Sequence, residues 1–197
     1  MMMTMDDIFT IFRETGALRE GHFELTSGRH SDRFFLMPHI FQHPNYTDRL
    51  CEGLAELFRD VEIDTVLGPA TGGIILAFGV ARALSQQRGG RGPRAVFTEK
   101  TDDGKMALKR QWSLQQGERV LVVEDAVTTG GSIFKALNAI AQYQPEIVGV
   151  GCVADRSGGT VAFPAPLRAL VTLQVESWPP ADCPLCRQGI PVVKPKA

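Results

Sequence analysis

One stretch of the chain, residues 120–132, constrains the fold and the chemistry more than any other. It reads VLVVEDAVTTGGS, an apolar run that ends in two acids and then in a Thr/Gly loop. Four β-forming residues in a row predict a strand buried on both faces, and the apolar spacing of residues 133–140 predicts a helix. The acids and the loop therefore lie where a strand passes into a helix, which is where α/β sheets bind ligands.

The loop that follows the acids suits a phosphate group. Its small residues let successive backbone N–H groups converge, and a helix that begins near Ser132 points its positive end toward them. Glu124 and Asp125 cannot bind phosphate themselves, but they can accept hydrogen bonds from sugar hydroxyls or hold water on a Mg²⁺ ion. A lone Gly-Gly pair would indicate an ordinary turn, whereas this combination favours a sugar phosphate over a bare nucleotide.

Two other phosphate-binding classes are excluded by their motifs. Gly68 and Gly73 have the spacing of a P-loop, but Ile74 and Ile75 stand where Lys and Ser or Thr are required. No Gly-x-Gly-x-x-Gly follows any predicted strand, which argues against a dinucleotide-binding enzyme. A nucleotide-hydrolysing P-loop protein and a dehydrogenase are therefore both poor interpretations.

Size and charge limit the partners. A chain of 197 residues with 44% hydrophobic content is long enough for one domain with a sizeable core and a small appendage. A net charge of −1 provides no field that would attract nucleic acid or an anionic membrane. We therefore expect a small-molecule substrate, with neither nucleic acid nor membrane as a partner.

The chain shows no membrane or secretory signal. Its first residues lack a basic region followed by an apolar core, and the apolar stretch 66–84 is interrupted by glycines, Pro69 and Arg82. Four cysteines are too few and too scattered for a disulfide framework in a chain of this length. The protein is expected to be cytoplasmic, with reduced thiols.

Cys183 and Cys186 are spaced as half of a zinc site. No second pair of Cys or His at knuckle spacing accompanies them, so a turn of the tail with two free thiols is the simpler interpretation. A zinc ion shared across a dimer remains open.

The remaining patterns predict the architecture. Amphipathic segments indicate helices at 6–15, at 45–58 with Asn45 as its cap, and at 74–85. A strand–turn–strand hairpin is predicted for residues 21–35, with Ser27 and Gly28 in the turn. The other strands are expected at 65–67, 94–98, 119–124, 146–153 and 167–174. This order predicts an α/β fold with a doubly wound, mainly parallel five-stranded sheet.

Two further loops belong to the same edge of this sheet. Residues 68–73 form a second strand-to-helix corner with exposed N–H groups, suited to another anion. Residues 99–118 are a charged segment too long for an ordinary connection, and Asp103-Gly104 predicts that it closes on itself as a hairpin, as a lid would. The segment carries four cations, Lys100, Lys105, Lys109 and Arg110, of which we expect one or two to reach the substrate.

The central stretch resembles the phosphoribosyl-pyrophosphate (PRPP) binding motif of type I phosphoribosyltransferases, which has four hydrophobic residues, two acids, two small residues and then Thr-Thr-Gly-Gly. The resemblance implies that Glu124 and Asp125 contact the ribose hydroxyls and that the loop wraps the 5′-phosphate. It also implies that residues 70–73 bind pyrophosphate. The PRPP-binding residues are then Glu124, Asp125, Ala126, Val127, Thr128, Thr129, Gly130, Gly131, Ser132, Ala70, Thr71, Gly72, Gly73 and Lys100.

The predicted hairpin and its following aromatics resemble the orotate-binding hood of orotate phosphoribosyltransferases. Thr26 stands where some members of that family carry a basic residue, and Arg156 resembles the arginine that binds the orotate carboxylate. A salt bridge from Arg156 to Asp155 at the rim is the alternative. The orotate-binding residues that the resemblance implies are Ser27, Gly28, Arg29, Phe34, Phe35, Thr128 and Arg156.

The same resemblance supplies catalytic candidates, namely Lys100, Lys105 and Asp125. Lys100 aligns with a lysine of the family's mobile loop, while Glu99 replaces the arginine that precedes it in well-known members. Related enzymes often place a lysine where this chain has Gly72. Lys105 is therefore the second choice for a cation at the pyrophosphate, with Lys109 and Arg110 as further options.

Taken together, these features predict an enzyme that makes orotidine 5′-monophosphate and pyrophosphate from orotate and PRPP in pyrimidine biosynthesis. Mg²⁺ is the expected cofactor, held by PRPP and by water near the two acids rather than directly by side chains. A single domain is expected over 1–197, with a hood from 1–45 and 176–197 and a core of 46–175. The family also implies a homodimer in which the mobile loop of one subunit covers the site of its neighbour.

Two alternatives stay open for the function. One is a phosphoribosyltransferase for a different base. The other is a non-catalytic regulator that senses PRPP, although such proteins usually add a helix-turn-helix or a basic RNA-binding face that the first sixty residues here do not provide.

Overall fold

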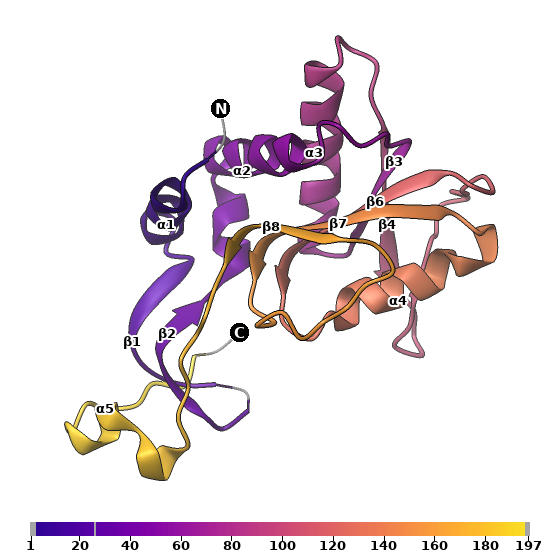
Figure 1. The fold of residues 1–197 in the computed structure, drawn as a ribbon. Coiled ribbons are helices and arrows are strands. Elements are labelled where there is room, and N and C mark those ends of the chain that lie inside the picture. Colours follow the sequence, from indigo (N-terminus) through magenta and orange to yellow (C-terminus); the bar gives the residue numbers. More distant parts are fainter. Residues whose placement is uncertain (1–2, 26, 196–197) are drawn as a thin grey trace.

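A six-stranded sheet forms the centre of the computed structural model, which describes residues 3–25 and 27–195 (Figure 1). Its strand order is β5-β4-β3-β6-β7-β8, and all pairs are parallel except β4 with β5. The strands are β3 Thr65–Pro69, β4 Arg94–Lys100, β5 Met106–Ala107, β6 Arg119–Val127, β7 Glu146–Asp155 and β8 Leu167–Thr172. The prediction of a mainly parallel five-stranded sheet is confirmed, with the short β5 added at one edge.

Strand β6 is buried on both faces, as its apolar run predicts. Val120 and Val122 pack into the core on one side of the sheet, while Leu121 and Val123 pack into the core on the other side. All four side chains are fully buried. Because alternate residues of a strand point to opposite faces, this run gives the two cores one shared strand.

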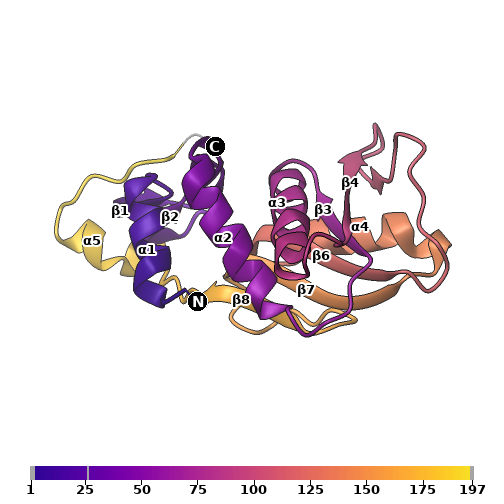
Figure 2. The ribbon, with the colours of Figure 1, turned by 90° about the horizontal axis from the view of Figure 1, so that it is seen from above.

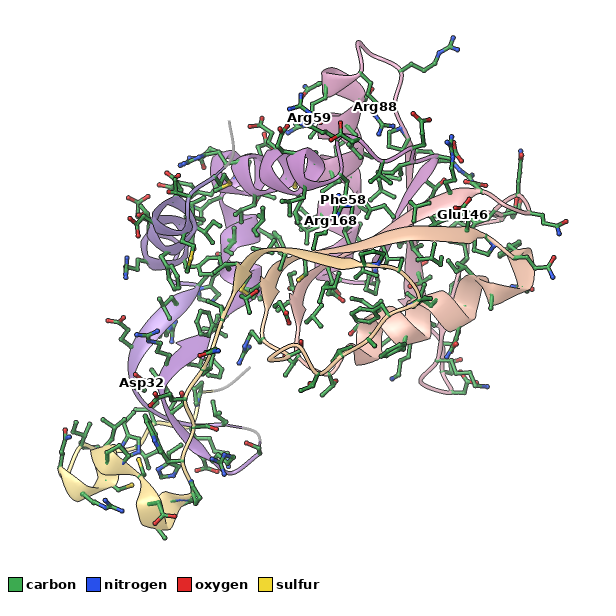
Figure 3. All side chains as sticks on the ribbon, in the orientation of Figure 1. Asp32, Phe58, Arg59, Arg88, Glu146 and Arg168 are labelled. Carbon is green, nitrogen blue, oxygen red and sulfur yellow. The ribbon has the colours of Figure 1, made fainter. Side chains whose placement is uncertain are left out.

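Helices cover both faces of the sheet. In Figure 1, α2 and α3 lie above it and α4 lies below it. The long helices are α2 Pro44–Leu57, α3 Gly72–Gln87 and α4 Gly131–Ile140, and a short 3-10 turn, η2 Ala141–Tyr143, follows α4. Arg168 of β8 extends under α2, where its guanidinium lies 4.9 Å from the centre of the Phe58 ring (Figure 3).

Some predicted boundaries are corrected. Strand β6 continues to Val127 rather than ending at Glu124, so Asp125 also lies within the strand. Helix α2 begins at Pro44 with His43 as its N-cap, so the prediction of Asn45 as the cap was wrong. A proline is well suited to the first helical position, because its missing N–H needs no partner there.

The N-terminal hairpin and the C-terminal tail lie together at the far end of the molecule from β4, as Figures 1 and 2 both show. Strands β1 Leu18–Glu24 and β2 His30–Phe35 form an antiparallel pair. Single bridges join Phe23 to Val193 and His30 to Trp178. The other elements of this end are α1 Met5–Glu14, η1 Met37–Gln42, η3 Pro180–Asp182 and α5 Pro184–Arg187.

The long charged segment after β4 closes on itself as predicted. Glu99 pairs with Ala107 and Lys100 with Met106, and Gly104 has the positive φ of +77° that the turn requires. Within residues 3–25 and 27–195, no helix is long and apolar enough to cross a membrane.

Candidate functional site

Two acidic residues, Glu124 and Asp125, follow one another near the carboxyl end of β6, and their side chains point to opposite faces of the sheet. The Glu124 side chain is only 8% exposed, and burial, followed by the neighbouring charge of Asp125, raises the pKa of Glu124 to about 8. Burial also raises the pKa of Asp125, although the Ala126 N–H and the charge of Arg156 oppose the shift. Both acids are therefore held where a cation or a set of hydroxyl donors would be favourable.

The predicted phosphate loop, Ala126 to Ser132, follows Asp125 directly. A cavity of about 390 Å³ lies over it and over the start of α4. Gly130 adopts a φ of +73°, and a Cβ there would lie 2.9 Å from the Phe163 ring and from Val161. The first N–H groups of a helix have no intrahelical acceptor, so the start of α4 presents donors to an anion. The cavity is lined by Lys100, Met106, Glu124, Ala126, Val127, Thr128, Thr129, Gly130, Gly131, Ser132, Ile133 and Lys135.

The second loop, residues 70–73, packs against the Asp125 carboxylate at Gly72. A Cβ at Gly72 would lie 2.8 Å from Oδ2 of Asp125 and 3.1 Å from the Phe41 ring. A Cβ at Gly68 would lie 1.9 Å from the carbonyl oxygen of Gly73. Gly68 therefore allows the β3–α3 corner to close tightly on itself, and Gly72 allows the corner to approach Asp125.

Arg156 reaches the site from the end of β7. Its backbone N–H donates to the Val127 carbonyl at 2.7 Å, which joins the ends of β6 and β7. Its guanidinium lies 5.3 Å from the centre of the Phe35 ring, and its Nε is buried without a hydrogen-bond partner. Burial lowers the pKa of Arg156, while the charge of Asp125 opposes the shift.

The alternative role for Arg156 was a salt bridge to Asp155. Among the residues that the structure describes, Arg156 makes no ion pair within 4.0 Å. The Asp155 carboxylate instead accepts from the backbone N–H of Ser157 at 2.8 Å. A half-buried guanidinium whose buried Nε has no partner is a position for an anionic ligand, because an unsatisfied buried donor is costly.

The hairpin brings only some of its predicted residues to this site. Phe35 is buried next to Arg156, whereas Phe34 packs on Phe23 with ring centres 5.7 Å apart. Ser27 and Gly28 are exposed at the turn. The Arg29 side chain donates to Ser177 Oγ at 2.9 Å, so it is engaged with the tail. Thr26 lies outside the described residues.

The predicted cations separate into two groups. Lys100 lines the cavity over the phosphate loop. Lys105 is 81% exposed and pairs with Asp103 at 2.8 Å, and Arg110 pairs with Glu99 at 3.0 Å. Lys109 donates to the Lys100 carbonyl at 3.0 Å. Within this chain, Lys100 is therefore the only one of the four that lines the cavity.

The sequence did not single out three residues that line the cavity, one of which is the apolar Ile133 of α4. Lys135 belongs to the first turns of α4, and Met106 belongs to β5. Lys135 could have been found from its position, because a helix that begins at a phosphate loop carries its first side chains near that phosphate. Met106 offered no comparable signal, since β5 is only two residues long.

Comparison with known proteins agrees with this geometry. The phosphoribosyl transferase domain family matches residues 39–180. The orotate phosphoribosyltransferase of Desulforamulus reducens is 47% identical over 193 residues, with 98% of this chain and 97% of that protein covered. The orotate phosphoribosyltransferase of Thermus thermophilus is 45% identical over 186 residues, with 94% and 98% covered.

A solved structure shows the same fold with a ligand. The Mycobacterium tuberculosis orotate phosphoribosyltransferase in complex with PRPP is 25% identical and has a TM-score of 0.65, with 84% of this chain and 96% of that chain covered. The chain is similar to these enzymes over nearly its whole length. It also carries two loops, an acidic pair and an unpaired arginine at one edge of its sheet. The chain therefore belongs to the phosphoribosyltransferase family, among the orotate phosphoribosyltransferases.

Proposed function

We propose that this protein transfers the 5-phosphoribosyl group of PRPP to orotate and releases pyrophosphate, a step of pyrimidine nucleotide synthesis. The product is orotidine 5′-monophosphate. The observation that carries the choice of base is Arg156, a half-buried cation between Asp125 and the Phe35 ring, whose buried Nε has no hydrogen-bond partner among the described residues. Orotate differs from uracil chiefly by its carboxylate, which a guanidinium binds well.

The PRPP molecule would extend over both loops of the sheet edge. Ala126 to Ser132 would bind the 5′-phosphate through backbone N–H groups and hydroxyls, with the start of α4 behind them. Glu124 and Asp125 would accept hydrogen bonds from the ribose hydroxyls. The loop from Ala70 to Gly73, which touches Asp125 at Gly72, would bind the pyrophosphate.

The chemistry needs positioning and charge neutralisation rather than a covalent nucleophile. A ring nitrogen of orotate loses its proton to solvent and forms a bond to the anomeric carbon as the bond to pyrophosphate breaks, and pyrophosphate leaves with the electron pair. The sugar carbon passes through an oxocarbenium-like state, which the negative charge of Asp125 would stabilise. Lys100 is the cation of this chain best placed to neutralise the leaving group.

Mg²⁺ is the proposed cofactor, and the donor set fits it. Mg²⁺ prefers oxygen ligands and keeps several waters, and the Asp125 carboxylate lies beside the pyrophosphate loop. A dication nearby would also offset the cost of burying the charges of Glu124 and Asp125. Glu124 and Asp125 would hold the ion through its water shell, and the bound ion would neutralise part of the charge of PRPP.

The base would lie between the sheet edge and the hairpin. Arg156 would bind the orotate carboxylate, and Phe35 holds the guanidinium from the other side. Thr128 and the turn at Ser27, Gly28 and Arg29 would contact the remaining polar edge of the ring. Phe34 would act more remotely, by packing on Phe23 in the hairpin.

The proposal includes a single domain with a hood. Residues 46–175 would form the core, and residues 1–45 and 176–197 the hood. A homodimer would allow Lys105, which is exposed and does not line the phosphate-loop cavity of its own chain, to reach the site of a neighbour. All four cysteines are free, which fits a reducing, cytoplasmic compartment.

A substrate screen tests the function. Purified protein with PRPP and Mg²⁺ should release pyrophosphate with orotate, and should do so far more slowly with uracil, hypoxanthine or adenine. Turnover of one of the other bases without turnover of orotate would keep the reaction class and reject the base. Tight PRPP binding with no product from any base would favour the regulator instead.

A further inference from the structure

Four potential metal ligands converge where the C-terminal tail meets the hairpin, at the far end of the molecule from the phosphate loop. They are His22 of β1, His30 of β2, and Cys183 and Cys186 at the start of α5. One ligand atom of each lies within 4.8 Å of the other three. We propose that these side chains bind a zinc ion that fastens the tail to the hairpin within one chain.

The separations between the donor atoms suit a tetrahedral ion. Zinc bonds of about 2.3 Å to sulfur and about 2.0 Å to nitrogen place neighbouring sulfur and nitrogen ligands about 3.6 Å apart. Here Cys183 Sγ lies 3.4 Å and Cys186 Sγ 3.7 Å from His22 Nε2, and Cys186 Sγ lies 3.3 Å from His30 Nδ1. The two ring nitrogens are 2.9 Å apart, so an ion would move them a few tenths of an ångström.

A network of hydrogen bonds alone explains this arrangement poorly. Nε2 of His22 has a single lone pair in the ring plane, yet His30 and both cysteines approach that one nitrogen. Thiols are also weak donors and weak acceptors. A cation at the point where the four groups converge would use the lone pair of each of them.

The other nitrogen of His22 is already oriented for metal binding. Nδ1 lies 2.7 Å from the carbonyl oxygen of Ile190, to which it can donate only if it carries the proton. That tautomer leaves Nε2 free as a ligand, and metal-binding histidines usually have such a partner on their second nitrogen.

Burial and charge also fit the proposal. His22, His30 and Cys183 are at most 7% exposed, while Cys186 lies at the surface. Two thiolates balance the charge of Zn²⁺, and the two imidazoles are neutral. The ion and its ligands together therefore carry no net charge, which reduces the cost of burying the site. Sulfur and imidazole ligands in a closed four-coordinate set are typical of structural zinc.

Backbone hydrogen bonds at Trp178 and Val193 join the tail to the hairpin, but the tail has little apolar packing. In the segment 176–195, Cys183 is the only buried residue, and Ile190, Val192 and Val193 are all at least 40% exposed. Small units that lack a hydrophobic core generally depend on a disulfide or a metal. A metal crosslink would therefore add to the stability of the tail, and the Cys/His cluster is positioned to supply it.

The first experiment measures bound metal. Untagged protein grown with zinc in the medium should contain about one zinc ion per chain by elemental analysis, and the same ratio should appear in native mass spectra. Cys186→Ala should lower this content at least tenfold, and because Cys186 is exposed the variant should still fold. Cys152→Ala is the matched control, since Cys152 is a free cysteine in the sheet, and it should retain the metal.

A second measurement identifies the ligands. Protein reconstituted with Co²⁺ should show the visible absorption of a tetrahedral ion and a thiolate charge-transfer band, both of which should be lost in Cys186→Ala. Folded, reduced wild-type protein that holds less than a tenth of an equivalent after incubation with Zn²⁺ would overturn the proposal. A Cys183–Cys186 disulfide in the freshly purified protein would overturn it as well.

A third measurement tests the structural role. Chelation should speed amide hydrogen exchange in residues 176–195 and in β1 and β2, leave exchange in α3 unchanged, and be reversed by Zn²⁺. Exchange in the tail that does not respond to removal of a bound ion would show that the metal does not fasten the tail.

Discussion

The two ends of this molecule are ordered in different ways. The phosphate loop follows β6, a strand that is hydrogen-bonded on both sides and buried on both faces. The hairpin–tail unit, defined as β1, β2 and residues 176–195, has two strands, two single bridges and one buried residue in its tail. The first end is ordered by the core of the domain, whereas the second depends on a few local contacts.

This contrast separates two kinds of variant. Substitutions beside β6 should change the chemistry while the fold is retained, because many neighbours hold the backbone there. Substitutions in the hairpin–tail unit should loosen one part of the structure, because few buried contacts oppose local opening. The predictions below run from the largest expected effect to the smallest.

The largest effect is expected at Asp125. Asp125→Asn removes a buried negative charge beside the pyrophosphate loop and should lower kcat/KM by about 10²–10³-fold, as loss of a transition-state electrostatic contact does. Steady-state kinetics with both substrates varied gives the measurement. The control is Glu146→Gln at the opposite end of the sheet (Figure 3), which should leave kcat/KM unchanged. A loss below threefold in Asp125→Asn would contradict the assigned role.

The next largest effect is expected at Arg156, which contacts the hairpin at Phe35. Arg156→Ala removes a charged hydrogen bond that typically contributes ~1.5–3 kcal/mol, so kcat/KM for orotate should fall roughly ten- to hundredfold. The KM for PRPP should change little. Arg156→Lys keeps the charge without the guanidinium geometry and should give an intermediate loss. An unchanged kcat/KM for orotate would mean that the turn at Ser27 to Arg29 binds the carboxylate instead.

Lys105 tests whether a second chain completes the site. Lys105→Ala and Asp125→Asn subunits, each nearly inactive alone, should recover up to about a quarter of wild-type activity after mixing, if the loop acts in the neighbour's site of a symmetric dimer. The estimate assumes random pairing, with half of the dimers mixed and one intact site in each. Lack of recovery, with subunit exchange shown by mass spectrometry, would place Lys105 in the site of its own chain.

Loss of a ligand in the Cys/His cluster should have a smaller effect on catalysis. Cys186→Ala should raise the KM for orotate about tenfold or less, because Arg29 and the hairpin turn are held through the tail at Ser177. The kcat and the KM for PRPP should stay close to wild type. Steady-state kinetics distinguishes this pattern from that of Asp125→Asn, and an equal loss for both substrates would contradict the division between the two ends.

The smallest effect is expected at a surface ion pair of the core. Arg119 donates to both carboxylate oxygens of Asp64 at 2.7 and 2.9 Å, and these bonds lower the pKa of Asp64 to about 2. A depressed carboxylate pKa contributes stability above about pH 4 that is lost as the pH falls through 2. Asp64→Asn should lower the free energy of unfolding by about 1 kcal/mol or less, since the pair is exposed.

Denaturant unfolding at several pH values checks this last prediction. The difference between wild type and Asp64→Asn should be constant near neutral pH and should shrink between about pH 4 and 2. A difference that grows on acidification would have the wrong sign for this pair. A decrease of several kcal/mol in the free energy of unfolding at neutral pH would show that the Arg119–Asp64 pair contributes more to stability than an exposed ion pair should.

The sequence by itself determined the central sheet and the position of the phosphate loop. The run from Val120 to Val123 is apolar at every position, and only a strand with a core on each side accommodates that pattern. The loop needs Thr and Gly in consecutive positions, so its chemistry depends on residues that are adjacent in the sequence. Such local patterns can be found without knowledge of the rest of the fold.

Tertiary structure alone decided what meets across long separations. Gly72 contacts Asp125, Arg156 contacts Phe35, and Cys183 meets His22 across 161 positions of the sequence. The spacing of the two cysteines showed half of a metal site, but the histidines follow the alternation of a hairpin and carry no ligand spacing of their own. Their convergence depends on how the tail returns to β1 and β2, because contacts between distant segments are set by packing rather than by local sequence.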